Sequence, residues 1–359
     1  MMTRSRTLLV VSLLVCIALI IPGCQPSASS YIESGNAYIE KEEYDQAIAD
    51  FTTALETAPK SPEAYLGRGI AYLQKKQYDQ ALADFNKLVE LQPDSSNAYY
   101  WHGRCLFMSK KLTEAIADLS KSIELDSNNA NSYLFRGMAL KALGKCDEAL
   151  VDLTRAIELG TLDEKLLATP YYHRGICYGE MKDYDAAIAD YSKYIEMKPE
   201  FYGAYNNRGW YYLMKGDYEK ALADINKALE LNPDDYYSWD SRGYVYYQMG
   251  DFKQAVADLS KALDIEQEAA DSYCHRGKAY YALKEYDKAI VDFSWAIKLD
   301  KRGIEAVACG CAESFYYRGL CYKAVGKLDD ARADFQAAAS RSIDPLLKEK
   351  AVNELKGME

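Results

Sequence analysis

A single glycine returns at a nearly constant interval along this chain of 359 residues. The members of this glycine column are Gly35, Gly69, Gly103, Gly137, Gly175, Gly209, Gly243, Gly277 and Gly319. Six of the eight intervals are 34 residues, and an alanine follows each glycine by twelve positions. A fixed period of this size predicts nine stacked repeats, each of which buries its apolar face against its neighbours. We therefore expect function on an extended surface rather than in one deep core pocket.

Each repeat has the pattern of two helices. An aromatic residue lies four positions before the glycine, as Tyr65 does before Gly69. This step places both residues on one helical stripe and marks the glycine as a point where another helix approaches closely. Residues 44–56 show apolar residues at steps of three and four, which predicts the second helix. Glycines such as Gly144 and prolines such as Pro199 mark the helix ends.

These columns together resemble the tetratricopeptide repeat family. The resemblance implies an all-α fold, an α-solenoid of helix-turn-helix repeats forming a right-handed superhelix. The nine repeats are expected over residues 31–345, with longer connections near residues 160–170 and 301–314. Residues 346–359 are expected to form a capping helix, because the last repeat of a stack otherwise exposes its apolar face.

The amino terminus has the pattern of an exported protein. Two arginines precede an apolar run at residues 8–21, which predicts a signal peptide over residues 1–23. The residues around Cys24 resemble the bacterial lipobox, which implies a lipoprotein with fatty acyl chains such as palmitate on Cys24 and a tether at residues 24–30. The expected location is the bacterial cell envelope, on the outer membrane if the host has two membranes. The alternative is an uncleaved membrane anchor in which Cys24 is an ordinary thiol.

The charge of the chain argues against nucleic acid as a partner. The whole chain carries a formal net charge of −11, and loss of the two arginines in the predicted signal peptide makes it −13. Phosphate backbones are repelled by such a surface.

No group of residues has the pattern of a catalytic or metal site. The three histidines fall in separate repeats, and no nucleophile or paired carboxylate recurs beside them. Cys105, Cys177 and Cys321 occupy a column that is alanine in four other repeats, so we expect them to be packing residues. Cys309 and Cys311 could oxidise or bind a soft metal, but no second pair stands at zinc-site spacing. We expect neither catalytic residues nor a cofactor.

Two charged columns suggest an ion pair. Arginine directly precedes the glycine in seven repeats, and aspartate follows it by fifteen positions in all nine. The first repeat has Ser34 instead, which suggests that each aspartate bonds to the arginine of the following repeat. The predicted neighbours include Asp84 with His102, Asp118 with Arg136 and Asp224 with Arg242. A ligand role for these residues is the alternative.

The remaining stripe of the first helix corresponds to the concave groove in which tetratricopeptide repeat proteins bind peptides or partner helices. The candidate contact residues are Tyr100, Arg104, Phe107, Tyr172, Asn206, Trp210, Tyr237, Tyr244, Tyr247, Tyr281 and Tyr316. Lys278 lies on the same stripe. Tyrosine, tryptophan and arginine are enriched at binding hot spots. With 32 tyrosines in the chain, the alternative is that some of them simply pack on their neighbours.

The sequence thus favours a membrane-anchored, non-catalytic scaffold or adaptor that binds a protein or peptide in its groove. The alternative is a glycan-binding protein, or one that serves polysaccharide export, since sugar rings stack on tyrosine and tryptophan.

Overall fold

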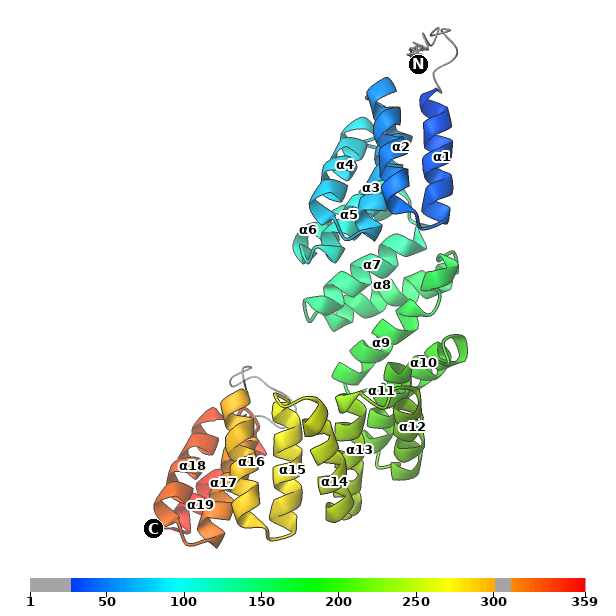
Figure 1. The fold of residues 1–359 in the computed structure, drawn as a ribbon. Helices are drawn as coiled ribbons and strands as arrows, with labels where there is room; N and C mark the ends of the chain where they lie inside the picture. The colour runs from blue at the N-terminus through cyan, green and yellow to red at the C-terminus, as the bar shows by residue number, and fades with distance from the viewer. Residues whose placement is uncertain (1–26, 301–310, 359) are drawn as a thin grey trace, which may run out of the picture. The chain divides into compact units, whose positions relative to one another are not determined.

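The structure, a computed structural model, describes residues 27–300 and 311–358. Over these ranges the chain forms nineteen α-helices and one short 3-10 helix, without a strand (Figure 1). Two compact units divide it, residues 1–127 and 128–359, and each is described by itself. Within the described ranges, no helix combines the length and the apolar character that a membrane span requires.

The helices of unit 1 are α1 (Ala28–Glu40), α2 (Tyr44–Thr57), α3 (Pro62–Gln74), α4 (Tyr78–Leu91), α5 (Ser96–Met108) and α6 (Leu112–Leu125). Those of unit 2 are α7 (Ala130–Ala142), α8 (Cys146–Leu159), α9 (Thr169–Glu180), α10 (Tyr184–Met197), α11 (Tyr202–Met214), α12 (Tyr218–Leu231), α13 (Tyr236–Met249), α14 (Phe252–Ile265), α15 (Ala270–Ala282), α16 (Tyr286–Leu299), α17 (Cys311–Ala324), α18 (Leu328–Arg341) and α19 (Pro345–Lys356). A 3-10 helix, η1 (Glu164–Leu166), lies in the connection from α8 to α9.

The first helix begins within the range that the sequence assigned to a tether. Ser27 caps α1 by accepting a hydrogen bond from the backbone N–H of Ser30, so Ala28 already belongs to the helix. The signal peptide, Cys24, Cys309 and most of the 301–314 connection lie outside the described residues, as does the side chain of Cys311.

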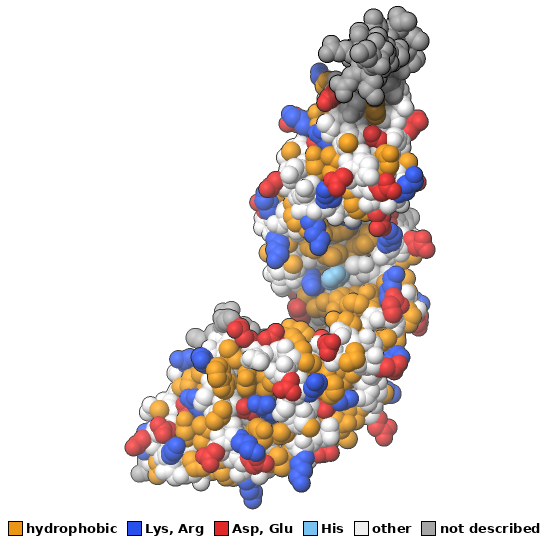
Figure 2. Space-filling view, viewed as in Figure 1, with side chains coloured by type: hydrophobic (Ala, Val, Ile, Leu, Met, Phe, Trp, Pro, Cys, Tyr) orange, Lys and Arg blue, Asp and Glu red, His pale blue; other side chains and the backbone are white. Residues whose placement is uncertain are grey.

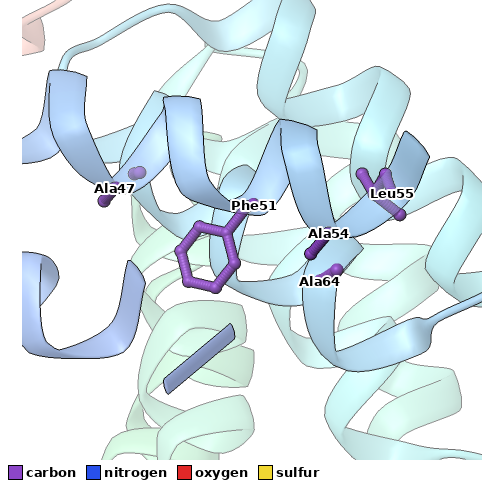
Figure 3. Close-up of a cluster of buried hydrophobic side chains, with 6 residues drawn as sticks. Ala47, Phe51, Ala54, Leu55 and Ala64 are labelled. Atoms are coloured by element: carbon purple, nitrogen blue, oxygen red, sulfur yellow. The ribbon is translucent and has the colours of Figure 1, made fainter. Parts of the chain in front are cut away.

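Consecutive helices pack in pairs, and the glycine column lies where the two helices of a pair meet. A Cβ atom on Gly209 would stand 2.7 Å from Cγ1 of Ile225, and one on Gly35 would stand 2.8 Å from the ring of Phe51. Figure 3 shows Phe51 between Ala47 and Ala54 in the core of unit 1, where all three are fully buried. The predicted α-solenoid architecture, a series of packed helix pairs, is confirmed.

The turn inside each helix pair contains one residue in the left-handed conformation. Gly144, Gly216, Gly250 and Gly326 hold this place as predicted, with φ between 75° and 84°. In other turns the same place is held by Glu42 or by a lysine, with φ near 60°. Those non-glycine residues accept a conformation that costs about 1 kcal/mol.

The predicted direction of the ion pairs is wrong. Arg68 donates from Nε and Nη2 to both carboxylate oxygens of Asp84, at 2.9 and 2.8 Å, so the bond joins the two helices of one pair. The same arrangement joins Arg136 to Asp152, Arg174 to Asp190, Arg208 to Asp224, Arg242 to Asp258, Arg276 to Asp292 and Arg318 to Asp334. His102 bonds to Asp118 in the equivalent place.

Most of these arginines also use their third nitrogen, Nη1, to bond to the preceding helix pair. This second bond explains why the first repeat has Ser34 in place of an arginine. Nη1 of Arg208 donates to Ser192 Oγ on the second helix of the preceding pair, at 3.0 Å. Arg68, Arg174, Arg242, Arg276 and Arg318 reach Thr52, Thr154, Asn226, Ser260 and Ser294 in the same way. Among the described residues no second helix precedes α1, so an arginine at position 34 would lack this acceptor.

At the carboxyl end, α19 packs against α18 and buries Ala351 completely. Glu354 of α19 also forms an ion pair with Lys323 of α17, with 2.7 Å between its carboxylate and Lys323 Nζ.

We expect Arg242→Met to lower the free energy of unfolding by about 3 kcal/mol, because it removes the only cation paired with the buried carboxylate of Asp258 among the described residues. Denaturant titration followed by circular dichroism measures the change. The matched control is Lys227→Met, which removes an exposed ion pair with Glu230 and should cost less than about 1 kcal/mol. Equal losses in the two variants would contradict the importance assigned to the buried pair.

Candidate functional site

The candidate site lies on the first helices of the pairs in unit 2, namely α9, α11, α13, α15 and α17. Consecutive members of this series touch each other, α11 with α13, α13 with α15 and α15 with α17. Their shared surface is called the first-helix face below. Figure 2 shows hydrophobic side chains at the surface among charged ones on the viewed side of unit 2.

The centre of the first-helix face is a stack of aromatic rings. Tyr244 lies with its ring nearly parallel to that of Trp210 on α11, at 5.8 Å between centroids and 24°. His275 on α15 lies closer to Tyr244, at 4.3 Å and 26°. Tyr247 continues the stack one turn along α13, at 5.8 Å and 13°. Burial raises the pKa of Tyr244 and Tyr247, which keeps both hydroxyls protonated and able to donate.

A hydrogen bond and an ion pair, both partly buried, join successive first helices beside this stack. His275 Nδ1 lies 3.0 Å from Asp240 on α13, and Lys278 Nζ lies 2.6 Å from Glu313 on α17. Lys278 is only 5% exposed, and its ammonium lies 5.8 Å from the ring centre of Tyr244. Lys278 is thus an internal cation rather than a groove contact. Sequence spacing did not reveal these pairs, because the partners are 35 residues apart and belong to different repeats.

A second aromatic cluster surrounds Tyr172 on α9. Its ring lies 5.2 Å from Tyr194 and 5.6 Å from Phe201. The amide of Asn207 donates to the hydroxyls of Tyr172 and of the buried Tyr191, at 3.3 and 3.2 Å. Tyr172 is therefore partly a packing residue, as the sequence allowed for some of the tyrosines.

The other candidates in unit 2 differ in exposure. Tyr237 is 61% exposed and lies 4.0 Å from the ring of Tyr236. Tyr281 is partly buried against Tyr317 at 5.6 Å, and Tyr316 against Phe335 at 5.9 Å. Tyr237 thus offers the most surface to a partner among these candidates.

The three candidates in unit 1 form a local group. Tyr100 is only 4% exposed. Its ring packs against Trp101, and its hydroxyl accepts from Arg104 Nη1 at 3.1 Å, so little of this side chain is left for a groove contact. Arg104 also lies over the ring of Trp101, at 4.8 Å. Phe107 is partly buried.

The described residues contain no group of three or more potential metal ligands. Cys105, Cys177 and Cys321 are fully buried, as predicted for packing residues. Burial raises the pKa of Cys105 to about 12 and disfavours its reactive thiolate.

Comparisons with known proteins agree with this architecture. Models described as tetratricopeptide repeat match residues 32–96, 128–200, 172–236, 208–274 and 270–302. The chain belongs to the tetratricopeptide repeat family. A model of subunit 3 of the anaphase-promoting complex, or cyclosome, matches residues 74–156. A search of curated proteins finds no match.

The solved structures that share the fold include these two. One is a tetratricopeptide repeat protein from Parabacteroides merdae, 19% identical, with a TM-score of 0.58 over 73% of this chain and 98% of that one. The other is the Cut9–Hcn1 hetero-tetramer of the anaphase-promoting complex, 16% identical, with a TM-score of 0.58 over 92% of this chain and 76% of that one. At these identities the likeness shows the fold alone.

The partly buried His173 on α9 makes stability depend on pH. Burial lowers its pKa to about 4, so between that value and its unfolded pKa near 6.5 the unfolded chain binds the proton more readily. The free energy of unfolding therefore falls as the pH drops through this window. His173→Phe, which copies Phe135 of the preceding repeat, should remove up to about 3 kcal/mol of that loss. Urea titrations at pH 7 and near pH 4.5 test this, and identical losses in both proteins would contradict it.

Proposed function

We propose that the protein is a non-catalytic scaffold that binds a peptide or protein segment along the first-helix face of unit 2. The observation that carries the proposal is the aromatic stack of Trp210, Tyr244 and Tyr247, which spans two touching helices. Rigid aromatic side chains lose little entropy on binding and dominate hot spots. A partner lying across the helices would meet one such group per helix pair.

The geometry favours a peptide over a glycan. Sugar rings stack on open aromatic faces, but a face of Tyr244 is covered by His275 at 4.3 Å. The rings of Trp210 and Tyr247 also lie nearly parallel to the ring of Tyr244 and limit access to it. The groups left for a ligand are ring edges and phenol hydroxyls, which suit hydrogen bonding to a peptide backbone.

A polar atom on α11 also suits a peptide. Oδ1 of Asn206 is buried and has no hydrogen-bond donor in the part of the chain that the structure describes. Such an acceptor is costly when unpaired. A backbone N–H of a bound segment would satisfy it beside Trp210, after a small movement that admits the segment.

A peptide selected from a random library on the full chain serves as the probe for this face. We expect Trp210→Ala to weaken its binding by at least about 2 kcal/mol, because the truncation removes an aromatic anchor and exposes one edge of the Tyr244 stack. Tyr237→Ala should weaken binding with no loss of stability, since that side chain is 61% exposed. Fluorescence anisotropy measures affinity, and circular dichroism measures helicity.

The matched control is Lys227→Ala on α12, whose ion pair with Glu230 lies on an exposed helix face. Unchanged affinity in both aromatic variants would place the functional surface elsewhere. Binding on a glycan array, with no peptide selected, would favour the alternative ligand.

We also propose that Cys24 carries lipid and tethers the protein to a bacterial envelope membrane, the outer one if the host has two. The support is the sequence alone: a basic and apolar leader followed by a lipobox-like segment that ends at Cys24. Several acyl chains, each burying many methylenes at about 0.8 kcal/mol apiece, would hold the protein firmly at the surface.

We expect Cys24→Ala to abolish incorporation of radiolabelled palmitate and to move the protein from the detergent phase to the aqueous phase, or to leave it unprocessed. Cys105→Ala is the control, because that thiol is buried in unit 1 and should not affect partitioning. Partitioning that survives loss of Cys24 would favour an uncleaved anchor.

A further inference from the structure

The exposed side of the second helices carries a repeated pair of opposite charges. After five of the nine column glycines, a lysine or arginine eighteen residues later bonds to a glutamate three residues further on. The pairs are Lys87–Glu90, Lys121–Glu124, Arg155–Glu158, Lys193–Glu196 and Lys227–Glu230, on α4, α6, α8, α10 and α12. All of these side chains are at least 40% exposed, so they form an ordinary solvated surface.

The pair is absent from α2 and α14, and the last two second helices, α16 and α18, replace it with uncharged side chains in the column of its cation. The equivalent stripe of α16 consists of Lys288, Val291, Trp295 and Lys298, and that of α18 consists of Asp330, Ala333, Ala337 and Ser340. Val291 is 55% exposed and Trp295 is 40% exposed. A bulky apolar stripe therefore stands beside a stripe of small side chains.

The stacking of the helices does not require the tryptophan. Trp295 lies on Tyr273 of α15, with 6.1 Å between ring centroids. Five other repeats hold a lysine in the column of Trp295, and one holds an arginine. Lys298 lies 4.2 Å from the centre of the indole ring, and no ion pair with a carboxylate is formed by it within residues 27–300 and 311–358.

The two stripes belong to neighbouring helices. Arg318 on α17 donates to Ser294 of α16 at 2.9 Å and to Asp334 of α18 at 2.7 Å. One side chain therefore bridges α16 and α18, which run in the same direction as second helices of successive pairs.

We propose that the exposed stripes of α16 and α18 form an interface between two copies of this chain. A two-fold axis between these helices and parallel to them places α16 of one copy on α18 of the other, with equal columns facing each other. Lys288 then faces Asp330, which forms no ion pair among the described residues. Val291 faces Ala333, and Trp295 faces Ala337. Large side chains thus meet small ones, and one cation meets one anion, at two places related by the axis.

The opposite arrangement is disfavoured by charge. A two-fold axis perpendicular to the helices would place α16 on a second α16 running antiparallel to it. Lys288 would then face Lys298 of the other copy, and like charges across an interface act against association. The charges on the two stripes therefore favour the dimer whose two-fold axis is parallel to the helices.

The size of the patch predicts a weak dimer. A helix of 14 residues is about 21 Å long, and two helices of about 10 Å diameter make a face of about 400 Å² per copy. The total of about 800 Å² lies below the range of stable complexes. We therefore expect association that depends on concentration, with a Kd in the range of about 10 to 100 µM.

Light scattering on the full chain in non-ionic detergent, over about 5 to 500 µM, tests the proposal. The wild type should move from monomer towards dimer. Trp295→Lys combined with Lys298→Glu gives α16 the same surface pair as Lys227 and Glu230 on α12. The fold should therefore stay intact while the Kd of the dimer rises at least about tenfold. Ala337→Lys should act in the same way from the other side of the interface.

A charge exchange gives the sharpest control. Lys288→Asp should weaken the dimer, and adding Asp330→Lys to it should restore the dimer with the charges reversed. Val151→Ala on α8 should change nothing, although Val151 is 70% exposed. A wild type that stays monomeric throughout, or a dimer unaffected by the Trp295 and Ala337 variants, overturns the proposal. If the monomeric wild type captured other proteins through Trp295, the stripe would serve a different partner and the proposed dimer would be wrong.

Discussion

The structure depends on one close contact, the approach of each column glycine to a large apolar side chain sixteen residues later. In unit 1 this is Gly35 against Phe51, and in unit 2 it is Gly209 against Ile225. A Cβ on Gly35 or Gly209 would stand within 3 Å of these partners, so the side chain of the second helix packs directly on the glycine backbone of the first. That contact fixes the separation within each pair. The stripes that are not used for it are left free to vary from one helix pair to the next.

A second layer of contacts, built around the arginine beside the glycine, holds the pairs to one another. Arg208 binds Asp224 of its own pair and Ser192 of the preceding one, and it lies over the ring of Tyr205. The guanidinium has five donors in a rigid plane, so one side chain can meet three neighbours at once. A lysine could not replace it. With stacking assigned to these columns, the remaining first-helix stripe and the outer second-helix stripe are the surfaces on which a partner can be recognised.

Much of the fold could be predicted from the sequence because the contacts that make it are local and repeated. The helix pairs, the left-handed glycines and the buried Cys105, Cys177 and Cys321 all follow from columns with a fixed spacing. The direction of the arginine pairs was predicted wrongly, since a missing arginine in the first repeat has two explanations that spacing alone does not separate. The pairs His275–Asp240 and Lys278–Glu313 were missed because each occurs once and joins different repeats. Burial of Tyr100 depends on its neighbour Trp101, which periodicity does not report.

The span of the arginine pairs has a consequence for how the chain acquires this structure. In each case the two partners are sixteen residues apart, as in Arg68 and Asp84 or Arg276 and Asp292. Each bond therefore closes a short loop, and the entropy lost in closing it is small compared with that of a long-range strand pairing. Chains rich in such local contacts fold quickly, and a stack of them can nucleate at any pair and grow in both directions. While the chain is being synthesised, a helix pair that has already folded would present the hydroxyl or amide oxygen to which the arginine of the next pair donates.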